Sequence, residues 1–186
     1  KEAIKRNGIL PMQYITAYNT IKAAVLPHET KVMILAAIDD AVETAAGNVP
    51  SVGNDVLIAI DESGSMGCLE RDNAAMFAAV LLKANPKADV MFFATTARYV
   101  KFNRNLPLLE LIQVIRNSFQ SGSTNFNAIF TVANKAYDSV VTLSDNEGWV
   151  GGGAPVQWHA AYKRAYNCDP VIFCFDLGGD GALMFR

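Results

Sequence analysis

The 186-residue chain lacks any uninterrupted apolar stretch that approaches the ~18 residues of a membrane span, and no signal peptide is visible. It also lacks an excess of positive charge, because 16 Lys and Arg face 18 Asp and Glu and the net charge is -2. This balance does not match the electrostatic signature of a general nucleic-acid binder. The three cysteines are odd in number and lack metal-ligand spacing, which indicates reduced thiols in an intracellular protein. We therefore expect a cytoplasmic protein with no membrane partner.

Motifs of several enzyme classes are missing as well. The first predicted strand is not followed by the Gly-x-Gly-x-x-Gly of dinucleotide sites, and Ser65 stands in an incomplete Gly-x-Ser-x-Gly pattern. Aspartyl-phosphate phosphatases need a second carboxylate two residues after the aspartate, and that position is Ser63 here. The only histidines are His28 and His159, and His159 fits a partly buried helix position. These absences predict that the protein is not an enzyme.

What the sequence does contain, from Val56 onward, is an alternation of strand and helix patterns. The expected strands are 56–60, 90–94, 97–101, 139–143 and 171–175, and the expected helices are 69–84, 106–119, 126–136 and 155–166. The 97–101 segment follows its neighbour after a tight turn, so we expect it to be antiparallel at a sheet edge. Such alternation predicts a doubly wound α/β domain with a mostly parallel sheet flanked by helices.

A short α-helical segment precedes this domain. Helical spacing of apolar residues predicts helices over 11–24 and 29–46, joined by a turn at Pro27. The expected apolar stripes are Tyr14, Ile15, Tyr18, Ile21 and Val25 in the first helix, and Val32, Leu35, Ala36, Ile38 and Val42 in the second. Such a pair cannot bury its faces alone, so we expect either the last unit of a helical repeat array or a lid on the following domain.

Oxygen-bearing side chains follow the predicted strands. The apolar run Val56–Ile60 stops at an aspartate, two serines follow at alternate positions, and two later loops leave the same sheet edge. Carboxylates and hydroxyls suit a hard divalent cation, Mg²⁺ or alternatively Mn²⁺ or another divalent ion. The predicted metal ligands are Asp61, Ser63, Ser65, Thr124 and Asp145. The alternative is that the hydroxyl residues cap helices and Asp145 is a turn residue.

These residues carry a resemblance to known families. The pattern Asp61-x-Ser63-x-Ser65-Met66, with Thr124 and Asp145, resembles the metal-ion-dependent adhesion site of a von Willebrand factor A domain. Further stretches resemble the Ro autoantigen (TROVE) family: Ile9–Pro11 through Tyr18, Asn48–Pro50, Ser144–Trp149, Pro155 and Tyr162–Arg164. The resemblance implies a von Willebrand A or Rossmann-like fold for residues 51–186, incomplete at its C-terminus. It implies that residues 1–50 are the end of a HEAT-like helical repeat ring in a longer protein.

In that family the A-type domain closes the helical ring, and the ring binds small non-coding RNAs. The resemblance therefore implies a non-enzymatic ribonucleoprotein component whose RNA contacts lie mainly in sequence outside this chain. Lys1, Lys5 and Arg6 are either an edge of that surface or a solvated helix end. The alternative function is a metal-dependent protein-interaction or scaffold module without RNA, in which a partner supplies an acidic ligand to the metal. Glu62 departs from the family pattern, which usually has a small apolar residue there. It either draws a metal more tightly or faces solvent, and we expect it to face solvent.

Overall fold

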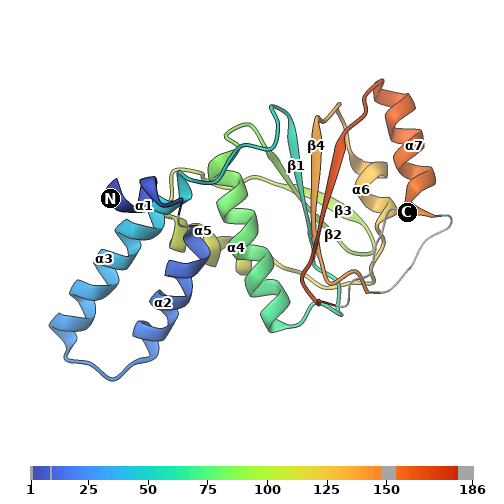
Figure 1. Cartoon of the computed structure of the whole chain (residues 1–186). Helices are drawn as coiled ribbons and strands as arrows, with labels where there is room; N and C mark the ends of the chain where they lie inside the picture. The colour runs from blue at the N-terminus through green and yellow to red at the C-terminus, as the bar shows by residue number, and fades with distance from the viewer. Residues whose placement is uncertain (1, 9, 148–153, 180–186) are drawn as a thin grey trace.

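The computed structural model describes residues 2–8, 10–147 and 154–179, and its centre is a five-stranded sheet with the order β3-β2-β1-β4-β5 (Figure 1). The strands are β1 (Val56–Asp61), β2 (Asp89–Phe93), β3 (Ala97–Val100), β4 (Ser139–Ser144) and β5 (Val171–Asp176). β3 pairs antiparallel with β2, and the other neighbouring strands pair in parallel. The predicted mostly parallel sheet is confirmed, together with its antiparallel edge strand.

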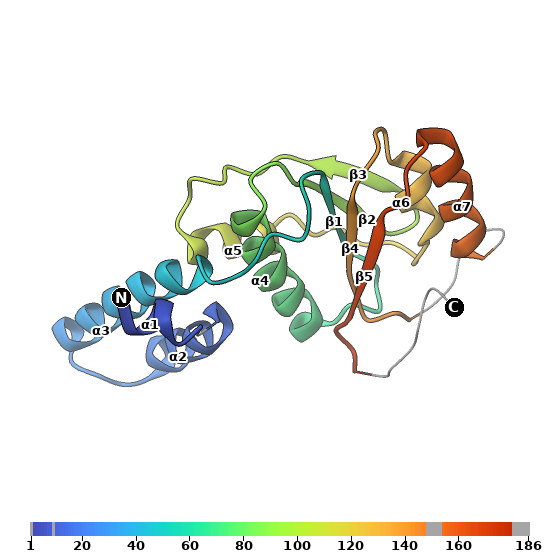
Figure 2. The same ribbon diagram turned by 45° about the horizontal axis from the view of Figure 1, so that its top comes forward.

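Helices cover both faces of this sheet. The helices of the described residues are α1 (Glu2–Arg6), α2 (Pro11–Ala23), α3 (His28–Ala46), α4 (Cys68–Ala84), α5 (Leu108–Arg116), α6 (Asn127–Val132) and α7 (Pro155–Tyr166). Helices α4 and α5 lie on one face, and α6 and α7 lie on the other (Figures 1 and 2). None of the helices in the described ranges combines the length and apolarity that crossing a bilayer requires.

The buried central strand β1 explains why its sequence is an unbroken apolar run. Ile58 and Ile60 pack into the core beneath α4 and α5, whereas Leu57 and Ala59 pack into the core beneath α6. A strand covered on both faces has no solvent side on which polar residues can alternate. The same run therefore ends where the sheet ends, at Asp61.

Two helices are shorter than the sequence predicts. The expected 106–119 helix begins only at Leu108, because Pro107 disfavours helical backbone in the residue before it. The expected 126–136 helix ends at Val132, where the backbone turns extended and the N–H of Asn134 donates to the hydroxyl of Tyr99 at 3.3 Å. The first boundary follows from a local effect of proline, whereas the second lies where Asn134 contacts β3, a contact that local periodicity does not encode.

Helices α2 and α3 form an antiparallel hairpin that extends away from the sheet (Figures 1 and 2). Its near end is anchored: Ile15 and Val42 join the core beneath α4 and α5. Glu43 of α3 accepts the backbone N–H of Leu108 at the start of α5 and lies 3.5 Å from the Lys83 amine of α4. Apolar packing and the contacts of the Glu43 carboxylate therefore together attach the hairpin to α4 and α5.

The predicted apolar stripes of the hairpin are wrong at its far end. Val25 is fully exposed and lies beyond α2, which ends at Ala23. Val32, near the start of α3, is 53% exposed, and Ala36, in the middle of that helix, is also exposed. No element in the described part of the chain covers this end, so helical periodicity there does not correspond to burial. The prediction for Lys1 and for the side chains of Lys5 and Arg6 falls outside the described residues, as does the resemblance at 148–149.

Candidate metal centre

The last residue of β1, Asp61, and the loop after it carry three of the predicted ligands. Asp61 is fully buried, and its Oδ1 accepts the backbone N–H of Ser63 at 2.8 Å. The hydroxyl oxygens of Ser63 and Ser65 lie 3.1 Å apart. Alternate residues of the loop therefore present their hydroxyls on one side, as the spacing predicts.

The loop after β4 is tied to the same aspartate. The hydroxyl of Ser144 donates to Asp61 Oδ2 at 2.5 Å and accepts the backbone N–H of Asn146 at 2.9 Å. The next residue, Asp145, is 3% exposed, and its Oδ1 accepts the N–H of Glu147 at 3.0 Å. Its other oxygen, Oδ2, is buried and has no hydrogen-bond partner among the described residues.

The third loop, residues 121–124, lies against the first. The N–H of Gly64 donates to the carbonyl of Gly122 at 2.9 Å, and Thr124, two residues later, is 6% exposed. A Cβ on Gly122 would lie 2.9 Å from the Cβ of Ala94, so only glycine permits this close approach. Hydrogen bonds thus join all three loops that carry the predicted ligands.

The two carboxylates of the site repel each other in a buried setting. Burial raises the pKa of the Asp61 carboxyl above its ordinary value, and the nearby Asp145 raises it further. Hydrogen bonds from Ser144 and Ser63 act in the opposite direction. A positive charge between these groups would offset both the desolvation and the repulsion.

The helix-capping alternative does not describe the serines and the threonine. The N-cap of α4 is Gly67 and that of α6 is Phe126, and neither helix has a side-chain capping hydrogen bond. The turn alternative explains only one carboxylate oxygen of Asp145. Its Oδ1 accepts the N–H of Glu147 in a turn, whereas its Oδ2 has no hydrogen-bond partner among the described residues. Helix capping therefore does not use the three hydroxyls, and Oδ2 of Asp145 is left without a hydrogen-bond partner among the described residues.

The donor set fits a hard cation. It consists of two carboxylates and three hydroxyls, which are oxygen donors of the kind that Mg²⁺ and Mn²⁺ prefer. In the described ranges no group of three or more His, Cys, Asp or Glu side chains could hold a metal.

Three residues outside the predicted set shape the site. Ser144 bridges to Asp61, and Arg71, from the first turn of α4, donates to the carbonyls of Met66 at 2.9 Å and Ser63 at 3.1 Å. The expectation that Glu62 faces solvent is wrong, because its side chain is 5% exposed and forms an ion pair with the Arg98 side chain. Serine at a strand end and arginine one turn into a helix are common, so the sequence carried little signal for either.

The two histidines lie elsewhere. His159 is partly buried on α7, as its sequence position suggested, and its ring centroid lies 5.1 Å from that of Phe130. His28 is exposed at the start of α3, in the hairpin. Neither histidine lies beside the predicted metal ligands, so neither position supports a histidine acting as a base there.

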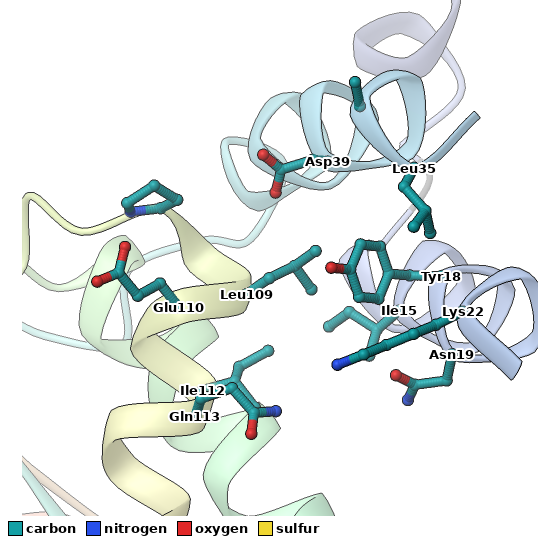
Figure 3. A pocket seen from close by; sticks show the side chains of 12 residues that line it. Ile15, Tyr18, Asn19, Lys22, Leu35, Asp39, Leu109, Glu110, Ile112 and Gln113 are labelled. Atoms are coloured by element: carbon teal, nitrogen blue, oxygen red, sulfur yellow. The ribbon is translucent and has the colours of Figure 1, made fainter. Parts of the chain in front are cut away.

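A separate pocket of about 450 Å³ lies between the hairpin and α5 (Figure 3). Leu109 and Ile112 of α5 face Ile15 and Tyr18 of α2 across it. The lining includes none of the five predicted metal ligands. Burial, together with Glu43 and Asp40 nearby, raises the pKa of Asp39 on its rim.

Comparison with known proteins gives one family. A family model described as the Ro60 vWA domain matches residues 55–174. Among solved structures, the Ro (RSR) protein of Deinococcus radiodurans has a TM-score of 0.76 and 22% sequence identity, and the match covers 100% of this chain. The chain spans 40% of the length of that protein.

A second solved structure is an aerotolerance-related membrane protein from Bacteroides fragilis, crystallised with multiple mutations to serines. Its TM-score is 0.43 at 18% sequence identity, and the match covers 64% of this chain and 66% of that protein. A TM-score this low does not support a shared fold or function. No curated protein matches the chain. The family model covers more than half of the sequence, and the RSR protein has the same fold. The chain therefore belongs to the Ro (TROVE) family and contains its von Willebrand factor A domain.

Proposed function

We propose that this chain is part of a cytoplasmic, non-enzymatic ribonucleoprotein component and that its A-type domain holds one divalent cation, Mg²⁺ or Mn²⁺. One observation carries the metal assignment. Asp145 Oδ2 is buried without a hydrogen-bond partner among the described residues, next to the equally buried Asp61. Two buried carboxylates, one of which has an oxygen without a hydrogen-bond partner, need a positive counter-charge nearby.

In this proposal the neutral and the charged side chains have different roles in binding the cation. The hydroxyls of Ser63, Ser65 and Thr124 would contact the cation directly, while Asp61 and Asp145 would hold its water ligands. Hydroxyls are neutral, so they leave most of the positive charge uncompensated. The bound ion would supply an electropositive position for a carboxylate or phosphate, which is the acidic ligand we expect from a protein partner.

The RNA part of the proposal rests on family membership. Small non-coding RNA is the partner that the Ro resemblance implies. A net charge of -2 gives this chain little electrostatic attraction for RNA. The RNA contacts therefore belong mainly to sequence outside this chain.

A metal titration of thermal stability tests the cation. Mg²⁺ or Mn²⁺ at one hundred times its dissociation constant should add about 2.7 kcal/mol to the free energy of unfolding. For a chain of this size the melting temperature should rise by roughly 5–10 °C relative to EDTA. Ser63→Ala and Asp145→Ala should abolish the rise, and Ser123→Ala, at an exposed position in the third loop, should keep it. Superimposable melts of the wild type in metal and EDTA would overturn the proposal.

Purification of the complete protein at low salt tests the RNA partner. Nuclease treatment of the particle should release small RNA visible on a gel. The small net charge of this chain favours a second candidate, a metal-dependent scaffold module that grips an acidic protein segment. A preparation that contains no RNA but still binds metal would support that candidate.

A further inference from the structure

Glu62 lies between two predicted metal ligands, yet its side chain is used elsewhere. Its Oε1 accepts the Nε–H of Arg98 at 3.1 Å, and its Oε2 accepts an Nη2–H of the same guanidinium at 2.7 Å. Oε2 also accepts the backbone N–H of Gln120 at 2.8 Å. With 4% of its surface exposed, the carboxylate is a buried charge with three charge-assisted hydrogen bonds.

Arg98 extends this contact to a second point of the same segment. It lies on β3, its guanidinium carbon is 4.8 Å from the centroid of the Phe92 ring, and its Nη2 donates to the carbonyl of Ser118 at 2.7 Å. The Glu62–Arg98 pair therefore fixes the backbone at Ser118 and at Gln120. Both residues belong to the connection between α5 and α6.

That connection continues directly into the candidate site. Two residues after Gln120, the carbonyl of Gly122 accepts the N–H of Gly64, and two residues later comes Thr124. The N–H of Ser123 donates to the hydroxyl of Thr95 at 3.0 Å. The segment is thus held at successive points, and the Glu62–Arg98 pair supplies those at its start.

We propose that Glu62 is a positioning residue of the metal site, which acts through Arg98 to set Thr124 against Ser63 and Ser65. Glu62 is not a ligand, because its oxygens face Arg98 and Gln120. The affinity of the site for a cation nevertheless depends on it. This inference rests on the proposed metal binding.

The pair also offers conservative replacements. Glu62→Gln keeps the length of the side chain and one acceptor oxygen but removes the charge. Arg98→Lys keeps the charge but cannot reproduce a planar fork that serves both carboxylate oxygens and the carbonyl of Ser118. Both variants retain most of the packing volume, so they keep the test informative where Glu62→Ala does not fold.

The experiment is a calorimetric titration of the purified chain with Mn²⁺, paired with urea denaturation in EDTA. We expect Glu62→Ala, Glu62→Gln and Arg98→Lys each to weaken Mn²⁺ binding by about 10–100-fold, the usual effect of removing support behind metal ligands. The double variant Glu62→Gln/Arg98→Lys should be no weaker than the worse single variant, because the two side chains act as one unit. Arg116→Ala is the matched control, since its ion pair with Asp72 joins α5 to α4 without touching the loops.

The outcomes separate the two proposals. Wild-type binding of Mn²⁺ with unchanged affinity in all Glu62 and Arg98 variants would overturn the positioning role and leave the metal site standing. That result, accompanied by lower stability in EDTA, would identify the pair as a purely structural support. A wild type that does not bind Mn²⁺ would overturn the metal site and the positioning role with it.

Discussion

Removing one hydroxyl tests how the first and last ligand loops are joined. Ser144 is fully buried at the end of β4, and its side chain donates to Asp61 and accepts from Asn146. Ser144→Ala deletes a single oxygen and leaves the rest of the packing in place. The loss of stability therefore reports these two hydrogen bonds.

The expected magnitude follows from the charge and burial of the acceptor. A hydrogen bond to a charged group contributes about 1.5–3 kcal/mol, and the 2.5 Å distance to the Asp61 carboxylate is that of a short, charge-assisted bond. The variant also deprives the Asn146 N–H of this acceptor. Together we expect a loss of about 2–4 kcal/mol.

Urea denaturation in EDTA measures this loss without any contribution from bound metal. With a denaturant dependence of about 2 kcal/mol per M, the midpoint should fall by roughly 1–2 M. Ser123→Ala, an exposed serine in the third loop, should leave the midpoint unchanged. If Ser144→Ala matched that control, the bridge between Ser144 and Asp61 would contribute nothing and our account of the loops would be wrong.

Three further changes test how the loops, the hairpin and the core are held. Gly122→Ala should lower the free energy of unfolding by about 1–3 kcal/mol, because an added Cβ would lie 2.9 Å from that of Ala94; an unchanged urea midpoint would contradict this close approach. Glu43→Ala should cost about 1 kcal/mol, since its carboxylate accepts the Leu108 N–H, and Glu43→Gln, which keeps an acceptor, should cost less; equal losses would argue against the hydrogen bond. Tyr137→Phe should cost about 1–2 kcal/mol, because the hydroxyl of this buried residue makes two hydrogen bonds; wild-type stability would count against them.

The sheet is predictable from sequence because its signals are local. The run from Val56 to Ile60 is apolar at every position, which fits only a strand or helix covered on all sides, and the turn residues after it limit its length. The tight turn at Thr95 and Thr96 in the same way indicates that β3 folds back on β2, which the register confirms.

The exposed end of the hairpin shows where periodicity fails. Val25 lies beyond the end of α2 at Ala23, so the helix stops before the predicted stripe does. Val32 does lie on α3, yet burial requires a neighbour, and the described residues provide none at that end. Periodicity reports which residues share a face of a helix. It does not report what covers that face.

Glu62 shows a different limit. Nothing in its immediate sequence distinguishes a buried acid from a solvated one, because its partner Arg98 is 36 residues away on an edge strand. Polar groups are buried when a partner satisfies them, and such pairing arises only in the folded chain. Ser144 was missed for the same reason.

The most direct measurement is the anomalous difference density of a crystal grown with Mn²⁺. We expect a single peak within bonding distance of the hydroxyls of Ser63 and Ser65, with Thr124 beside it and water molecules leading to Asp61 and Asp145. A map with no peak among these side chains, or with its only peak elsewhere, would contradict the metal centre.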